Sequence, residues 1–313
     1  MGGELSTSSS QLLIEGRSLE VFEWKFADSH NIRDSRNTGG SRNIRDSRNT
    51  IVLIHEALGS ASYWKSFPEQ LARAACVNAV AYSRAGHGES EGPLEPRSVR
   101  YYQSQVETVL PQILRALSIE EPILYGHSEG AAIAFLYAAE GNPVKAIIAE
   151  SPIVAPGENT LRTVEQMDAA EPRAELIEKL RRYHRNPEGV FSSWVEGIQL
   201  HLARQFPVAS YLRRVQVPVL VLEGALDPFG GPAQRAILQA EIRNLHLTVL
   251  AQTGHLPHRE KTQEVIEAVA HFLTEPLEPA GKALNEDVCD PPGPSSPGPP
   301  RSSNEIHPPS QTE

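Results

Sequence analysis

The sequence predicts an α/β fold in which a mostly parallel sheet is flanked by helices and carries an inserted helical cap. Short runs of apolar, often β-branched residues alternate with helical segments, as in parallel sheets that are buried on both faces. Of the 313 residues, 40% are hydrophobic and 22% are charged, so the chain can build one large core. Two of the predicted strands are separated by roughly sixty residues of helical character, which is too long for a simple connection.

The predicted elements begin with a hairpin, Gln11–Glu15 and Leu19–Phe26, which turns at Gly16 and Arg17. The buried strands expected after it are Ile51–His55, Asn78–Ser83, Ile123–Tyr125, Val144–Ala149, Val217–Leu222 and Leu245–Leu250. The helices expected beside them are Ser62–Ala75, Ser98–Leu117, Glu129–Ala139, Pro232–Glu241 and Arg259–Leu273.

The long interruption runs from residue 153 to residue 216 and contains two helical stretches, Glu171–His184 and Pro187–Phe206. Parallel sheets bind their ligands at the carboxyl ends of the strands. We therefore expect residues 153–216 to form a helical cap over that edge of the sheet.

Three segments stand apart from the core of the domain, which we place at residues 11–275. Residues 1–10 are mostly polar and predict a disordered leader. Residues 276–313 contain 10 of the 25 prolines and few apolar residues, which predicts a disordered tail because proline lacks the backbone N–H. Residues 29–50 hold two nearly identical copies of one polar stretch, which we interpret as a duplicated surface loop.

The net charge of −10 makes the chain a poor nucleic-acid binder, because the phosphate backbone favours basic surface. Two cysteines are too few for a disulfide framework, and neither a signal peptide nor an apolar stretch of about 18 residues is present. We therefore expect a cytoplasmic protein without nucleic-acid or membrane partners. The first six residues fit a loose myristoylation pattern, which leaves lipidation of Gly2 open.

A nucleophile is indicated by the segment Tyr125-Gly-His-Ser-Glu-Gly130, which lies between a predicted strand and a predicted helix. Gly-x-Ser-x-Gly at such a junction is typical of a nucleophile elbow, where small residues relieve crowding around a strained serine. The N-terminus of the following helix favours negative charge beside it. Ser128 is therefore the predicted nucleophile.

A serine hydroxyl needs a base, and in this arrangement the acid and then the histidine follow the serine along the chain. Asp227 and His255 both lie on loops after predicted strands, at the edge of the sheet that holds Ser128. We expect His255 to accept the proton of Ser128 and Asp227 to fix the imidazole tautomer. His258 is the second candidate for the base, and Glu150, which also ends a strand, is the second candidate for the acid.

An oxyanion hole needs two backbone N–H groups directed at the developing charge. Glu129, which follows the nucleophile, is expected to supply one of them. The other is expected from the loop His55-Glu-Ala-Leu-Gly59, with Ala57 as the first choice and Glu56 or Leu58 one residue away.

These motifs resemble the α/β-hydrolase superfamily whose members carry a helical cap, over about Leu12 to Leu273. His55-Glu-Ala-Leu-Gly59 resembles its His-Gly-x-x-Gly loop, and Ser83-Arg-Ala-Gly-His-Gly-Glu-Ser90 resembles its Asp-x-Arg-Gly-x-Gly-x-Ser stretch, with Glu56 and Ser83 as departures. The acidic residue after the nucleophile, Trp194-Val-Glu-Gly-Ile198 and Leu212-Arg-Arg-Val-Gln-Val-Pro218 are most similar to the valacyclovir-hydrolase-like, or biphenyl-hydrolase-like, group.

The resemblance implies a serine hydrolase that cleaves a small carboxylic ester, an amino-acid ester or a lactone through an acyl-enzyme. No cofactor or metal is implied, and the sequence has no His/Cys cluster at zinc spacing. The serine nucleophile disfavours dehalogenase and epoxide hydrolase chemistry, for which relatives use aspartate. Two alternatives stay open: a C–C bond hydrolase of a diketone-like substrate, and a catalytically silent receptor or scaffold on the same fold.

Four residues are candidates for substrate binding: Glu56, Glu129, Trp64 and Trp194. The Glu129 carboxylate is expected either to attract a cationic group, such as an α-amine, or simply to complement the helix dipole. The two tryptophans line an apolar pocket in one interpretation and belong to the core in the other, which the helical spacing favours for Trp194.

Overall fold

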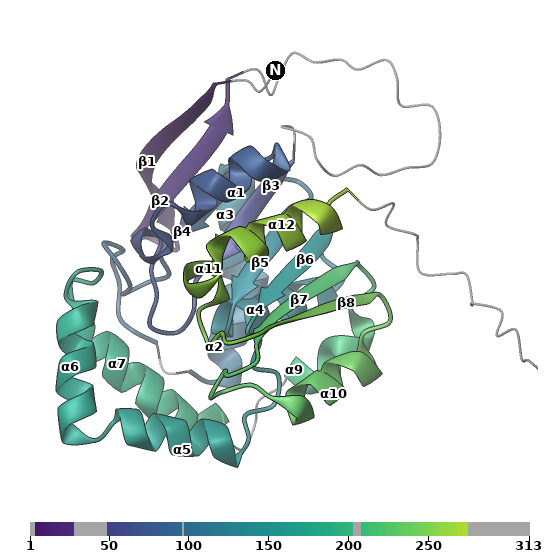
Figure 1. Ribbon diagram of the computed structural model, residues 1–313. Helices are drawn as coiled ribbons and strands as arrows, with labels where there is room; N and C mark the ends of the chain where they lie inside the picture. The colour runs from purple at the N-terminus through teal and green to yellow at the C-terminus, as the bar shows by residue number, and fades with distance from the viewer. Residues whose placement is uncertain (1–3, 28–48, 96, 203–207, 275–313) are drawn as a thin grey trace, which may run out of the picture. The chain divides into compact units, whose positions relative to one another are not determined.

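One eight-stranded sheet, in the order β1-β2-β4-β3-β5-β6-β7-β8, runs through this computed structural model, which describes residues 4–27, 49–95, 97–202 and 208–274 (Figure 1). The strands are β1 (Leu5–Ile14), β2 (Arg17–Phe26), β3 (Thr50–Ile54), β4 (Asn78–Tyr82), β5 (Ile123–His127), β6 (Ala146–Glu150), β7 (Val219–Gly224) and β8 (Leu245–Leu250). β2 pairs antiparallel with β1 and β4, and all other neighbours are parallel. The predicted α/β fold class is confirmed.

The first strand begins earlier than the sequence predicts. A disordered leader over residues 1–10 is wrong from Leu5 onward, because β1 pairs residue by residue with β2 along its whole length. The small polar side chains of this stretch bury little area, so backbone hydrogen bonds hold the ladder, with Leu5 and Ile14 buried at its ends. Glu15 and Gly16 both have positive φ, which fits the tight turn of a two-residue hairpin.

Two other predicted segments fall largely where the structure gives no description. The duplicated stretch at residues 29–50 is described only at Asn49 and Thr50, and the tail at residues 276–313 lies wholly outside the described residues.

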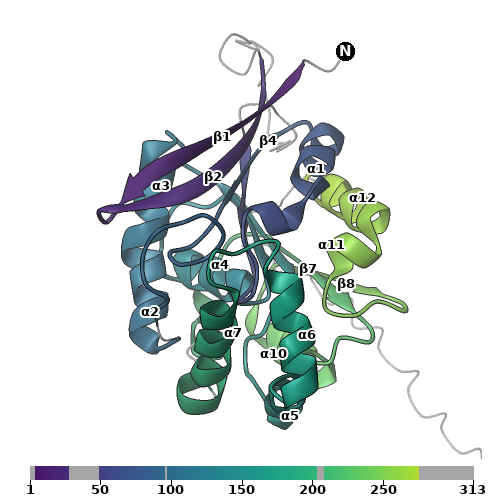
Figure 2. The same ribbon diagram turned by 90° about the vertical axis from the view of Figure 1, so that its left-hand side faces the viewer.

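Helices cover both faces of the sheet (Figure 2). Those that pack on the sheet or close to it are α1 (Phe67–Ala75), α2 (Val99–Ser104), the π-helix Gln105–Val109, α3 (Leu110–Ala116), α4 (Glu129–Ala139), α9 (Val208–Tyr211), α10 (Pro232–Glu241), α11 (Pro257–Glu260) and α12 (Thr262–Phe272). Side chains alternate along β3, so Ile51 joins the apolar cluster of α1 and α12, and Val52 joins that of α3 and α4. The central strands are buried on both sides for this reason, as their unbroken apolar runs predict.

The segment between β6 and β7 forms a group of helices beyond one end of the sheet, apart from the helices on its faces (Figures 1 and 2). The helices of this group are α5 (Glu158–Met167), α6 (Ala170–Leu180), α7 (Pro187–Glu196) and the π-helix Gly197–Leu202, whereas α9, later in the same segment, packs against α4. His184, between α6 and α7, lies 2.9 Å from the carbonyl oxygen of Leu58 through Nε2. This contact places the cap helices over the loop that follows β3, at the carboxyl edge of the sheet.

Candidate active site

Ser128 stands at the turn from β5 into α4 in a strained backbone conformation, with φ 52° and ψ −110°. A Cβ atom at Gly126 would lie 2.4 Å from the backbone of Gly130 and Ala131, and one at Gly130 would lie 2.0 Å from the carbonyl oxygen of Ile54. Only glycine fits at either position. The turn predicted from Gly-x-Ser-x-Gly is thus forced by close backbone packing on both sides of the serine.

Asp227 and His255 are paired at this edge of the sheet. Nδ1 of His255 lies 2.8 Å from Oδ2 of Asp227, and Oδ1 accepts a hydrogen bond of 2.9 Å from the N–H of Phe229. An ionised carboxylate only accepts hydrogen bonds, so Nδ1 carries the proton and Nε2 is left with its lone pair. This is the tautomer that a general base needs.

The charged forms of His255 and Asp227 stabilise each other. Burial opposes the imidazolium form, but the hydrogen bond and charge of Asp227, together with nearby Glu56 and Glu150, raise the pKa of His255 above its usual value. Burial also opposes ionisation of Asp227, but His255 and the N–H of Phe229 outweigh it and lower the pKa of that carboxyl. The site therefore stabilises the ion pair that forms when His255 takes up a proton.

The nucleophile turn is tied to the loop of the base by His127, the residue before Ser128. Its Nε2 lies 2.8 Å from the carbonyl oxygen of His255, so this nitrogen must donate. Burial lowers the pKa of His127 to about 3, which keeps the ring neutral. The structure thus brings Ser128, His255 and Asp227 onto adjoining loops.

The two alternative residues, Glu150 and His258, form a second acid–histidine pair with each other. Oε1 of Glu150 accepts from Nδ1 and from the N–H of His258, at 2.8 and 2.7 Å, and Oε2 accepts from the hydroxyl of Tyr125 at 2.7 Å. These side chains are 0% and 1% exposed, whereas that of His255 is 15% exposed. Solvent therefore reaches the side chain of His255, whereas Glu150 and His258 are enclosed by the protein.

The loop after β3 carries Ala57, the predicted oxyanion donor, between Glu56 and Leu58. The N–H of Leu58 donates to Oε2 of Glu56 at 3.2 Å. That N–H is engaged inside the loop, which argues against Leu58 as the donor. Glu56 itself is half-buried, and burial raises the pKa of its carboxyl, although the nearby His255 acts in the opposite direction.

Of the two roles predicted for the Glu129 carboxylate, attraction of a substrate amine is the less favoured, because two arginines already neutralise its charge. Oε2 lies 2.7 Å from Arg84 and Oε1 lies 3.3 Å from Arg97, and all three side chains are buried. Burial opposes ionisation, but Arg97 and Arg84 outweigh it and lower the pKa of Glu129. The side chain points into the protein, whereas the backbone N–H of Glu129 opens α4 beside Ser128.

The two tryptophans differ in their surroundings. The ring of Trp64 is buried among those of Phe67, Tyr125 and His258, at centroid distances of 6.0, 5.6 and 4.7 Å, so Trp64 belongs to the core behind the site. Trp194 contacts Phe229 at 6.3 Å, and Phe229 in turn lies 4.7 Å from His255. The rings of Trp194 and Phe229 thus connect the cap to His255.

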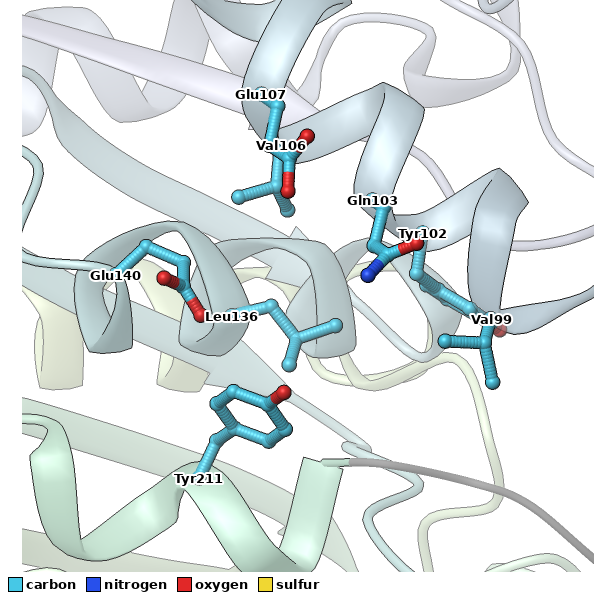
Figure 3. A pocket seen from close by; sticks show the side chains of 8 residues that line it. All are labelled: Val99, Tyr102, Gln103, Val106, Glu107, Leu136, Glu140 and Tyr211. Atoms are coloured by element: carbon cyan, nitrogen blue, oxygen red, sulfur yellow. The ribbon is translucent and has the colours of Figure 1, made fainter.

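One surface hollow is lined by none of the predicted catalytic residues (Figure 3). It has a volume of about 50 Å³ and is lined by Val99, Tyr102, Gln103, Val106, Glu107, Leu136, Glu140 and Tyr211. In the described part of the chain, no group of three or more His, Cys, Asp or Glu side chains is arranged to hold a metal ion. No helix among the described residues is long and apolar enough to cross a membrane.

Sequence comparison decides the family. The model of the α/β-hydrolase family matches residues 51–268. The chain belongs to this family. The match includes the predicted nucleophile, acid and base, and it leaves the closer likeness to the valacyclovir-hydrolase-like group as a prediction. No curated protein matches the chain.

Solved structures share the fold at low sequence identity. An enol-lactonase from Burkholderia xenovorans is 18% identical with a TM-score of 0.64, covering 85% of this chain and 100% of its own. A 2-hydroxy-6-oxo-6-phenylhexa-2,4-dienoate hydrolase from Rhodococcus is 16% identical with a TM-score of 0.67, covering 87% and 100%. A naproxen esterase from Bacillus subtilis is 16% identical with a TM-score of 0.61, covering 86% and 92%. Each likeness shows the fold alone.

Proposed function

We propose that the protein is a serine hydrolase that cleaves a small carboxylic ester or lactone through an acyl-enzyme. The observation that carries the proposal is Ser128 in a strained turn at a helix N-terminus, on a loop adjoining the hydrogen-bonded pair His255 and Asp227. A backbone strained in this way is costly and tends to persist where it serves a site.

In the proposed reaction, Nε2 of His255 accepts the proton of Ser128 as Oγ attacks the substrate carbonyl carbon. The tetrahedral intermediate collapses, the C–O bond to the leaving alcohol breaks, and His255 returns the proton to that oxygen. A water molecule, deprotonated by His255, then cleaves the acyl-enzyme and restores Ser128. Asp227 stabilises the imidazolium in both steps.

The negative charge of the intermediate is assigned to two backbone N–H groups, those of Glu129 and Ala57. Glu129 is the first residue of α4, where N–H groups have no partner within the helix. Ala57 is preferred in its loop because the N–H of Leu58 is engaged by Glu56. Removing one such donor from an oxyanion hole typically costs about 10² to 10³ in kcat.

The substrate class follows from what surrounds the site. The charge of Glu129 is balanced by two arginines, and Trp194 and Phe229 bring apolar surface toward His255. These features favour a small uncharged acyl group over a cationic one. The enol-lactonase and naproxen esterase with the same fold make lactones and carboxylic esters sensible first probes.

A panel of p-nitrophenyl esters, a thioester, amino-acid esters and lactones, assayed on the wild type and on Ser128→Ala, tests the proposal. We expect turnover of at least one ester or lactone by the wild type and none above background by the variant. A ring-fission diketone belongs in the same panel. Turnover of the diketone without turnover of any ester would replace the proposal by C–C bond hydrolysis on the same residues.

A further inference from the structure

The four carbonyl groups of the oxyanion loop, defined here as residues His55–Leu58, are all held by side chains from other parts of the fold. The contacts are Arg84 Nη1 to the oxygen of His55 (2.9 Å), Arg84 Nη2 to that of Glu56 (2.8 Å), Arg97 Nη2 to that of Ala57 (3.2 Å) and His184 Nε2 to that of Leu58 (2.9 Å). Nδ1 of His184 accepts from the N–H of Gly88, so its Nε2 must be the donor to Leu58.

Holding a carbonyl also orients the next N–H in the chain. In a planar trans peptide the C=O of one residue and the N–H of the following residue point in opposite directions. When Arg84 binds the oxygen of Glu56, it therefore turns the N–H of Ala57 away from itself. The direction of the proposed oxyanion donor is thus fixed by Arg84, whose side chain is buried.

Glu129 holds both arginines in place. Its Oε2 lies 2.7 Å from Nη2 of Arg84, and its Oε1 accepts from Nε of Arg97 at 3.3 Å and from the hydroxyl of Tyr102 at 3.3 Å. Buried guanidinium groups need a partner charge, and this carboxylate is shared by both. One residue thus supplies a proposed donor from its backbone and anchors the opposite donor loop through its side chain.

The same network reaches the cap. Nη1 of Arg97 donates to Oγ of Ser193 in α7 at 2.6 Å, while its Nη2 binds the carbonyl of Ala57. Arg97 also donates to Nε2 of His87 at 3.0 Å, which leaves that neutral ring to donate through Nδ1 to the carbonyl of Ala85. A movement of α7 would therefore be transmitted to the oxyanion loop through the guanidinium group of Arg97.

We propose that Glu129 is a positioning residue that sets the direction of the Ala57 N–H through Arg84 and couples the oxyanion loop to Ser193 of the cap through Arg97. This inference rests on the proposed serine-hydrolase function and names what shapes its oxyanion hole. Docking of the cap and formation of the oxyanion hole then depend on the same network of hydrogen bonds.

A double-mutant cycle with Glu129→Gln and Ser193→Ala tests the proposal. Glu129→Gln keeps the backbone N–H and nearly the shape of the side chain, but it removes the charge that holds the arginines. Ser193→Ala cuts the link between Arg97 and the cap, and it also removes the hydrogen bond of 3.1 Å from the Ser193 hydroxyl to the carbonyl of Val190 within α7. Ser192→Ala is the matched control, because Ser192 is also in α7 and its hydroxyl binds Arg173 rather than Arg97.

The measurements are kcat, KM and the inhibition constant of a trifluoromethyl ketone, whose adduct with the nucleophile places an oxyanion in the hole. We expect Glu129→Gln to lower kcat about tenfold or more and to weaken the ketone by a similar factor, with little change in KM. Ser193→Ala is expected to produce a smaller loss in the same two quantities, and Ser192→Ala none. The double variant is expected to resemble Glu129→Gln alone, because coupled residues are not additive.

Three results would overturn the inference while the wild type is active: unchanged kcat and ketone affinity in Glu129→Gln, strictly additive losses in the double variant, or equal effects of Ser193→Ala and Ser192→Ala. If Glu129→Gln does not fold, the comparison of the two serine variants still decides the link to the cap. A wild type that neither cleaves an ester nor binds the ketone would refute the proposed function, and the inference with it.

Discussion

Replacing Gly130 by alanine should slow catalysis while the protein still folds. The new methyl group would meet the backbone of the neighbouring strand. The added Cβ would lie 2.0 Å from the oxygen and 2.7 Å from the carbon of the Ile54 carbonyl, and 2.9 Å from the oxygen of His55. These atoms belong to the end of β3 and the start of the oxyanion loop. Neither can yield by a rotation of a side chain.

The size of the effect follows from the overlap. A Cβ needs at least about 3 Å from such an oxygen, so α4 and β3 must separate by roughly 1 Å at this point. A misplacement of about 1 Å costs on the order of 10² in rate, because the nucleophile and the oxyanion donors lose their alignment. Overpacking of this kind typically costs about 1–3 kcal/mol in the free energy of unfolding, which leaves a protein that folds but reacts slowly.

The assay compares kcat for the best ester with the denaturant midpoint, for the wild type, Gly130→Ala and Gly157→Ala. Gly157 is the matched control, because it has negative φ and a Cβ there would meet nothing within 4 Å. We expect the control to match the wild type in both measurements. Gly130→Ala with wild-type kcat would refute the claim that this close approach positions the nucleophile.

Two further predictions concern the acid–histidine pairs. Asp227→Asn removes the carboxylate that raises the pKa of His255, so NMR titration of that imidazole should show a midpoint at lower pH than in the wild type; an unchanged or higher midpoint would contradict the pairing. Burial opposes ionisation of Glu150, but the charge of His258 and the hydrogen bonds from its ring and backbone lower the pKa of that carboxyl to about 2. The stability from ionised Glu150 is therefore present above about pH 4.5 and is lost as the pH falls toward 2. Glu150→Gln should therefore cost about 3 kcal/mol in the free energy of unfolding at neutral pH and flatten the loss of stability in acid; a parallel acid profile in wild type and variant would contradict this.

The sequence was sufficient to place the three predicted catalytic residues at the ends of their strands. Ser128 is marked by the glycines that its turn requires, and Asp227 and His255 follow it in the order and on the edge that a parallel sheet brings together. The strand alternation along the central sheet was predictable for a similar reason, since burial on both faces leaves unbroken apolar runs.

What sequence reasoning missed depends on contacts between distant residues. Arg97 is 32 positions from Glu129 and 96 from Ser193 in the chain, and nothing in its immediate sequence marks it as the link between them. Arg84 lies in a recognisable motif, but its two hydrogen bonds to the oxyanion loop do not follow from that motif. The strand from Leu5 was missed because its pairing relies on backbone groups, which composition does not reveal.

The sequence also suggested catalytic roles for Glu150 and His258, which the structure pairs with each other. Each residue alone was a reasonable substitute for a member of the predicted triad, because both lie near the correct edge of the sheet. Only their mutual contact and complete burial show that they support each other instead of the substrate.

Labelling with a fluorophosphonate, followed by mass mapping of the modified residue, tests the central claim most directly. The wild type is expected to carry one adduct on Ser128 and to lose ester hydrolysis in proportion to labelling, while folded Ser128→Ala takes up none. A folded wild type that is not labelled, or an adduct that persists in Ser128→Ala, would contradict the assignment of Ser128 as the activated nucleophile.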